Sequence, residues 1–157
     1  MPTLYVETTI VSYLTARPGR DLVVAGHQQL TREWWESRRR LFALYISELV
    51  IREAEAGDRE AAQRRLDILE EIPLLQTTDE AIALGRRLIE DVPLPRRAAA
   101  DALDIALATV HGVEYLLTWN MAHIANAELR SRIERVCRSS GFEPPVLCTP
   151  EELMGGE

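Results

Sequence analysis

The chain has 157 residues, enough for one domain with its own hydrophobic core. Its formal net charge is −7, which argues against a protein coated in basic surface for bulk nucleic-acid binding. All 18 basic residues are arginine, so a P-loop phosphate-binding lysine and a Schiff-base lysine are both excluded.

The first part of the chain predicts strand, helix, helix and strand. Residues 3–6 form a short apolar run that ends at Glu7, so we expect a strand, a turn and a helix starting near Thr9. Residues 21–40 carry apolar side chains at helical spacing and predict an amphipathic helix. Residues 41–46 form a second apolar run, which predicts the second strand.

Capping residues mark the helices in the middle of the chain. Ser47 is typical of the N-cap of a helix over residues 48–56, which Gly57 would end. Asp58 would then cap a further helix that reaches about residue 71.

Helices and strands continue to alternate to the end of the chain. The remaining expected elements are a strand at residues 72–75, a helix at 78–90 with Ile82, Leu88 and Ile89 facing inward, a helix at 96–111, a strand at 113–118, a helix at 128–139, a strand at 146–148 and a final turn capped by Thr149. The apolar runs are continuous, as expected for strands covered on both faces. The sequence therefore predicts an α/β fold with a central parallel sheet of about five strands, in a single domain over residues 1–157.

The sequence carries no pattern typical of a signal segment, a membrane span, a disulfide framework or a zinc site. The N-terminus lacks a basic segment followed by a long apolar one, and no run approaches the roughly 18 apolar residues of a membrane span. Cys137 and Cys148 are too few and too isolated for a disulfide framework or a zinc site. We therefore expect a cytoplasmic protein.

Several polar residues lie just beyond the expected strands, where open parallel α/β folds bind their ligands. They are Glu7 and Thr8 after the first strand, Ser47 and then Glu53 after the second, Asp101 and Asp104 in the helix before the fourth, and Thr118 and Asn120 after the fourth. Acids gathered at one end of a sheet would repel each other unless a cation lies among them. Mg²⁺ and Mn²⁺ prefer oxygen ligands and can promote phosphodiester hydrolysis, so the pattern favours a metal-dependent hydrolase.

Four segments occur in the order and spacing of the PIN-domain family. They are residues 5–11 (YVETTIV), 46–53 (ISELVIRE), 100–106 (ADALDIA) and 115–120 (YLLTWN). The chain resembles the toxin branch of that family, the VapC-type ribonucleases of bacterial toxin–antitoxin pairs. The resemblance covers essentially the whole chain.

The resemblance implies a three-layer α/β/α sandwich and Mg²⁺- or Mn²⁺-dependent cleavage of RNA. It also implies a protein antitoxin as partner and a homodimer. Glu7 stands where the family usually has its first aspartate, and Glu53 and Asp101 stand at the second and third acids. These three residues are the expected metal ligands. Asn120 falls in the region where many members carry a fourth acid.

Two residues depart from the family pattern. Glu7 is one methylene longer than the usual aspartate, so the metal would sit differently or the backbone would recede. Asn120 is neutral and can ligate or donate a hydrogen bond, but it adds no charge. Asp104 could supply the missing negative charge from one turn further along its helix. The candidate catalytic set is therefore Glu7, Glu53, Asp101, Asp104 and Asn120.

Hydroxyls and arginines near these acids are candidates for contact with the substrate. Thr8, Ser47 and Thr118 could bind a phosphate, although such residues more often cap helices. Arg96 and Arg97 directly precede the Asp101 helix and could hold a phosphate beside the metal.

Two other functions remain open on the sequence. The neutral Asn120 and the substituted Glu7 are compatible with a catalytically weak or inactive PIN scaffold that binds RNA or a partner protein. A small-molecule phosphohydrolase is the other alternative, but its aspartyl-phosphate type needs an aspartate where Glu7 stands.

Trp119 could stack an RNA base or pack in the core, and His123 could bind metal or simply be hydrogen-bonded.

Overall fold

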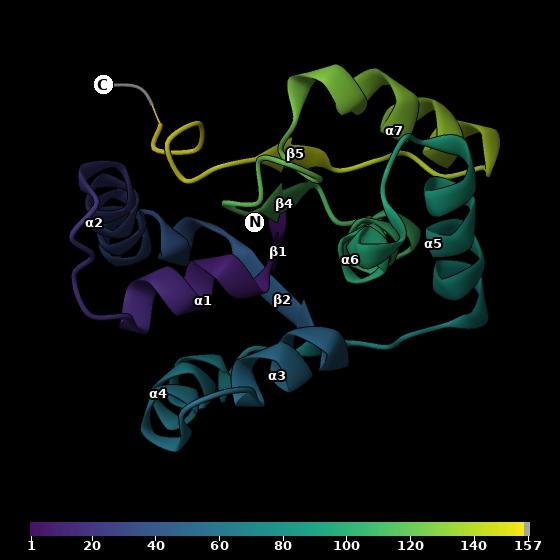
Figure 1. The fold of residues 1–157 in the computed structure, drawn as a ribbon. Helices are drawn as coiled ribbons and strands as arrows, with labels where there is room; N and C mark the ends of the chain where they lie inside the picture. Colours follow the sequence, from purple (N-terminus) through teal and green to yellow (C-terminus); the bar gives the residue numbers. More distant parts are fainter. Residues whose placement is uncertain (156–157) are drawn as a thin grey trace.

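The centre of the fold is a five-stranded parallel sheet in the order β3-β2-β1-β4-β5 (Figure 1). The structure is a computed structural model and describes residues 1–155. The strands are β1 (Thr3–Val6), β2 (Ala43–Ser47), β3 (Leu74–Leu75), β4 (Tyr115–Leu117) and β5 (Val146–Cys148). Because β1 lies between β2 and β4, its carboxyl end is flanked by two other strand ends.

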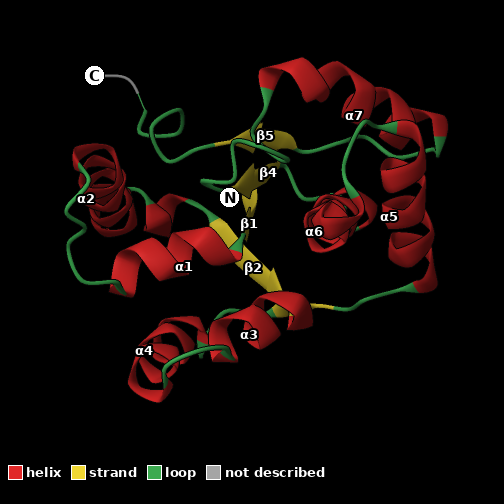
Figure 2. Cartoon of the chain, in the orientation of Figure 1, coloured by secondary structure: helices red, strands yellow, loops and turns green. Residues whose placement is uncertain are grey.

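Helices cover both sides of this sheet. They are α1 (Thr8–Thr15), α2 (Leu22–Ser37), α3 (Glu48–Glu55), α4 (Arg59–Leu69), α5 (Asp79–Asp91), α6 (Ala99–Val110) and α7 (Ala127–Ser139), with 3-10 turns at Arg39–Leu41 and Arg96–Ala98. Figure 2 shows α1 and α2 on one side of the strands and α5 and α6 on the other. The predicted α/β fold with about five parallel strands between helical layers is confirmed.

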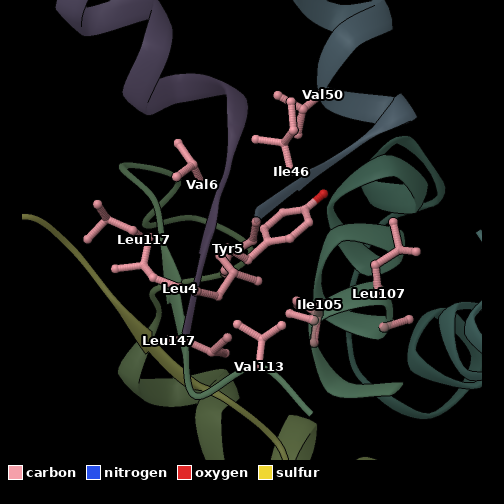
Figure 3. Packing of buried hydrophobic residues seen from close by; sticks show 14 of the residues in the cluster. Leu4, Tyr5, Val6, Ile46, Val50, Ile105, Leu107, Val113, Leu117 and Leu147 are labelled. Atoms are coloured by element: carbon pink, nitrogen blue, oxygen red, sulfur yellow. The ribbon is translucent and has the colours of Figure 1, made fainter. Parts of the chain in front are cut away.

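The hydrophobic core surrounds β1. Leu4, Tyr5 and Val6 are fully buried, as expected for a central strand with helices on both faces. Figure 3 shows the Tyr5 ring within this packing, with its hydroxyl oxygen on the side of the view where Ile46 and Val50 lie. The core thus reaches the carboxyl end of β1 and carries a polar group there.

Some element bounds differ from the predicted ones. The helix expected over residues 21–40 ends at Ser37, and a 3-10 turn follows. The helix expected over residues 96–111 opens as a 3-10 turn and becomes α-helical only at Ala99. The strand expected at residues 113–118 is confined to Tyr115–Leu117. Runs of apolar residues locate these elements, but hydrogen bonding decides where each one begins and ends.

One prediction about a single side chain, that of Ile82, is wrong, and another, that of Ser47, is confirmed in position only. Ile82 is 38% exposed, whereas Leu88 is buried as expected, because α5 packs on α6 through the face that carries Leu84 and Gly85. Ser47 occupies the N-cap position of α3, but its side chain makes no capping hydrogen bond. Its hydroxyl is used elsewhere, as described below.

Other local predictions are confirmed. Asp58 caps α4 by accepting the backbone N–H of Ala61 at 3.0 Å. Gly57 and Gly112 follow helices with φ of 83° and 68°, a conformation that favours glycine. Cys137 and Cys148 are buried and unbridged. Within residues 1–155, no helix is both long and apolar enough to cross a bilayer.

Candidate metal centre

Glu7 follows the last residue of β1 and is buried, with 4% of its surface exposed. It is the N-cap of α1, and its Oε2 accepts the backbone N–H of Thr9 at 3.2 Å. Its Oε1 accepts the hydroxyls of Thr9 and Thr118, each at 2.5 Å. Thr118 follows β4, so residues beyond two adjacent strands hold this carboxylate in one orientation.

Glu53 approaches the same place from α3. The hydroxyl of Thr8, the first residue of α1, donates to Glu53 Oε1 at 2.7 Å. Unlike Glu7, Glu53 is solvent-exposed. Its carboxylate therefore marks the open side of the site.

Asp104 comes from α6 and is almost completely buried, with 1% of its surface exposed. The hydroxyl of Tyr5 donates to its Oδ1 at 2.6 Å. The same hydroxyl lies 2.7 Å from Ser47 Oγ at the end of β2. Asp104 Oδ2 has no hydrogen-bond partner among the residues that the structure describes.

Glu7, Glu53 and Asp104 each offer one carboxylate oxygen, and these three oxygens all lie within 4.8 Å of one another. Burial raises the pKa of Asp104 well above its ordinary value, and the nearby charge of Glu7 raises that pKa further. Burial also raises the pKa of Glu7, although hydrogen bonds from Thr118 and Thr9 oppose this. The two buried carboxylates, Asp104 and Glu7, are thus costly to ionise unless a positive charge joins them.

A divalent cation fits this arrangement. The donors are all carboxylate oxygens, which hard cations prefer. The unpartnered Oδ2 of Asp104 is a buried acceptor, and such groups in native proteins normally have a partner. The three acids could therefore hold a metal ion.

Asp101, the third acid that the resemblance implies, has a different partner. Its Oδ2 lies 2.9 Å from Nδ1 of His123, and both side chains are about one-fifth exposed, at 19% and 20%. The side-chain oxygen of Asn120 accepts the backbone N–H of His123 at 3.0 Å. The structure thus brings Glu7, Glu53 and Asp104 together and links Asp101 and Asn120 through His123.

The five candidate substrate contacts lie in contrasting environments. Thr8 donates to Glu53, and the fully buried Thr118 donates to Glu7. Ser47 is fully buried with its hydroxyl at Tyr5, so it has no surface for a substrate. Arg96 and Arg97 are exposed in the 3-10 turn before α6. The hydroxyls therefore support the acids, and the arginines remain available to an incoming ligand.

Trp119 is used mainly in packing. It is 5% exposed, and its Nε1 donates to Thr31 Oγ1 at 2.7 Å. The ring of His27 stacks on it with centroids 4.0 Å apart and planes 12° apart. Of the alternatives left open for Trp119, the structure supports the packed one.

Tyr5 is the residue of the site that sequence reasoning missed. Its place in a short apolar strand predicts a core side chain, and its ring is in the core. The phenolic oxygen between Leu4 and Val6 is the signal for a second role, because a buried hydroxyl needs a hydrogen-bond partner.

Comparisons with known proteins show the fold. No protein-family model and no curated protein matches the chain. The chain is similar to a chain in the crystal structure of VapBC2 from Rickettsia felis bound to a DNA fragment from their promoter. The two share 16% sequence identity, with a TM-score of 0.53 over 76% of this chain and 89% of that one. The shared α/β architecture is consistent with a PIN-like fold.

Proposed function

We propose that this chain is a metal-dependent endoribonuclease, the toxin of a type II toxin–antitoxin pair, which hydrolyses RNA phosphodiesters in the cytoplasm with Mg²⁺ or Mn²⁺. The observation that carries the proposal is the unpartnered Oδ2 of Asp104 beside Glu7 and Glu53, three carboxylates whose oxygens lie within 4.8 Å of one another. The resemblance in sequence and the similarity to a VapBC2 chain support this choice among metal-binding functions.

Glu7, Glu53 and Asp104 would hold the ion. Bound there, it would supply Lewis acidity for the negative charge that develops on a phosphoryl oxygen. Glu7 is held rigidly by Thr9 and Thr118, which limits its movement during the reaction. Glu53 is exposed, so the substrate would approach from its side.

Residues around the three acids would bind the RNA. Arg96 and Arg97 are exposed just before α6 and would contact phosphates, which position the chain without reading its sequence. Asp101 orients His123 through Nδ1 at 2.9 Å and would place that imidazole beside the substrate. With a net charge of −7, attraction of RNA depends on such local basic groups.

The test is RNA cleavage by the purified protein with Mg²⁺, Mn²⁺ or a chelator. We expect cleavage only with a divalent ion, and a loss of at least about 100-fold in Asp104→Asn, since that change removes a ligand charge. Asp101→Asn separates the two candidate acids, because it leaves the three-acid cluster intact and removes the negative charge beside His123. Loss of activity in Asp101→Asn with unchanged metal affinity would assign Asp101 to substrate handling rather than to the ion.

A matched control is Glu60→Gln, an exposed acid on α4 that is not one of the three clustered acids. It should cleave as the unmodified protein does. Absence of cleavage with every divalent ion, or equal cleavage by Asp104→Asn, would contradict the proposal.

A PIN scaffold that binds RNA or a protein without cleaving is the second candidate. The observation that favours it is Asn120, which is neutral and whose side-chain oxygen already accepts a hydrogen bond from His123. The site then has one charge fewer than the four acids of many relatives. Calorimetric titration with Mg²⁺ and Mn²⁺ distinguishes the two candidates, because a scaffold without metal would give no binding heat.

The proposal includes two protein partners, an antitoxin and a second copy of this chain. A structural neighbour of this chain comes from VapBC2 bound to DNA, which supports an antitoxin protein as a partner here. We expect a short reading frame beside the gene that encodes a DNA-binding fold, and a homodimer in solution. Co-purification of the two gene products and the mass of the isolated chain by light scattering test these expectations.

A further inference from the structure

The buried hydroxyl of Tyr5 makes a directed chain of hydrogen bonds from β2 to Asp104. A tyrosine hydroxyl carries one proton, and in this structure it is donated to Asp104 Oδ1 at 2.6 Å. The contact of 2.7 Å between Tyr5 and Ser47 then uses the proton of Ser47. The direction is therefore Ser47 to Tyr5 to Asp104, from one fully buried hydroxyl to another and then to a buried carboxylate.

This chain makes the two oxygens of Asp104 different. Oδ1 has a donor, and Oδ2 has none among the described residues. Oδ2 is therefore the oxygen that is free for a cation, while one lone pair of Oδ1 is occupied and the bond to Tyr5 restrains the carboxylate from turning. The other two acids are also restrained, Glu7 by Thr9 and Thr118 and Glu53 by Thr8.

Packing alone does not account for the hydroxyl. Leu4 and Val6 on the same strand fill the core with aliphatic side chains, and a phenylalanine at position 5 would fill nearly the same volume as Tyr5. A buried hydroxyl is unfavourable unless it is hydrogen-bonded, and this one has a partner on each side. Its position therefore points to a role at Asp104.

We propose that Tyr5, supported by Ser47, is a positioning residue that fixes Asp104 as a one-oxygen ligand through Oδ2 and thereby makes the site prefer a small cation such as Mg²⁺ over Ca²⁺. This inference rests on the proposed function, because it requires that the three acids bind a divalent ion. Mg²⁺ needs short, nearly octahedral coordination, whereas Ca²⁺ accepts one or both oxygens of a carboxylate in flexible geometry. Outer partners that orient a metal ligand commonly change metal affinity by about 10- to 100-fold when they are removed.

The test is calorimetric titration of the RNA-free full chain with MgCl₂ and with CaCl₂. In Tyr5→Phe we expect the Mg²⁺ affinity to fall about 10- to 100-fold and the Ca²⁺ affinity to fall much less, because Asp104 becomes free to offer both oxygens. Ser47→Ala leaves the bond from Tyr5 to Asp104 in place, so its loss of Mg²⁺ affinity should be smaller and in the same direction. It also serves as the second variant if Tyr5→Phe does not fold by circular dichroism.

The matched control is Tyr45→Phe. Tyr45 pairs with Tyr5 in the register of β1 and β2, and its hydroxyl makes no hydrogen bond within residues 1–155. The same chemical change there should leave both affinities unchanged. Wild-type Mg²⁺ affinity in Tyr5→Phe, or an equal loss for both ions, would overturn the role of Tyr5 while leaving the metal site. Absence of binding to the unmodified protein would instead overturn the proposed function, and this inference with it.

Discussion

At the scale of single residues, the site contains two buried acids whose ionisation the protein does not favour. Asp104 is 1% exposed and Glu7 is 4% exposed, and burial is the main reason that the pKa of each is raised. Hydrogen bonds from Tyr5 and Thr118 offset part of this effect. The metal-free protein therefore carries a cost in stability that a bound cation would relieve.

The change Asp104→Asn should raise the stability of the metal-free protein. The amide has nearly the same shape, keeps an oxygen for the Tyr5 hydroxyl, and removes the buried charge beside Glu7. We expect an increase of about 1 kcal/mol or more near pH 8, which is roughly 2–4 °C in Tm for a domain of this size. Thermal unfolding in chelator measures it, with Glu60→Gln as the control. A lower Tm for Asp104→Asn would contradict the claim that the buried charge of Asp104 destabilises the metal-free protein.

The stability of the metal-free protein should fall as pH rises above the range where free carboxyls titrate, about pH 4. Both Glu7 and Asp104 have raised pKa values when folded, so in that window the folded chain keeps protons that the unfolded chain has lost. Stability then declines with pH until the folded groups ionise too. Unfolding in chelator between pH 5 and pH 8 measures the slope, which should be shallower in Asp104→Asn. Equal slopes would contradict this assignment.

The sequence could predict the acids but not which neighbours they would meet. Glu7 and Glu53 follow strands, and that place alone indicates the carboxyl end of a parallel sheet. Asp101 and Asp104 lie three residues apart on α6, so they share one helical face. The rotation of α6 about its axis, set by packing on β1 and α5, decides which acid is buried beside Glu7, and a one-dimensional pattern does not contain that rotation.

At the scale of elements, the position of Asp104 depends on how closely α6 packs. A Cβ added at Gly85 of α5 would lie 3.7 Å from the Leu103 backbone and 3.8 Å from the Ala106 side chain, which is ordinary contact. The space at Gly85 therefore admits one methyl group, but no larger side chain, between α5 and the helix that carries Asp104. The sequence predicted the two helices but not their contact. The 3-10 turns at Arg39–Leu41 and Arg96–Ala98, which depend on local hydrogen bonding, were not predicted.

Substitutions at Gly85 should have opposite effects according to size. Gly85→Ala should stabilise the protein by up to about 1 kcal/mol, because alanine favours helix and its methyl group fits. Gly85→Val should destabilise it by roughly 1–3 kcal/mol, because the extra carbons reach the Leu103 backbone. Urea denaturation of the two variants measures both changes in the free energy of unfolding. Equal stability of the two variants would show that the helices are not in close contact here.

At the scale of the whole molecule, the last described residues are hydrogen-bonded to the C-terminal part of α2 and its C-cap. The backbone oxygen of Leu153 accepts Trp34 Nε1 at 3.1 Å and Arg38 Nε at 3.4 Å. Trp34 is fully buried, so this segment covers part of a large indole ring. None of the three acids belongs to this segment or to α2.

Removal of residues 151–157 should therefore separate stability from metal binding. We expect the free energy of unfolding to drop by about 1–3 kcal/mol, because the Trp34 indole loses its hydrogen bond and part of its cover. Mg²⁺ affinity measured by calorimetry should stay unchanged. A parallel loss of metal affinity would show that the two regions are coupled.

The central place of β1 has a consequence for the protein during its synthesis. The strand leaves the ribosome before both of its neighbours, β2 from Ala43 and β4 from Tyr115. Thr118, which holds Glu7, follows later still. When only Glu7 and Glu53 have been synthesised, the third acid, Asp104, is still missing, and β1 lacks its neighbour β4. Translation itself keeps the site incomplete until most of the chain has emerged.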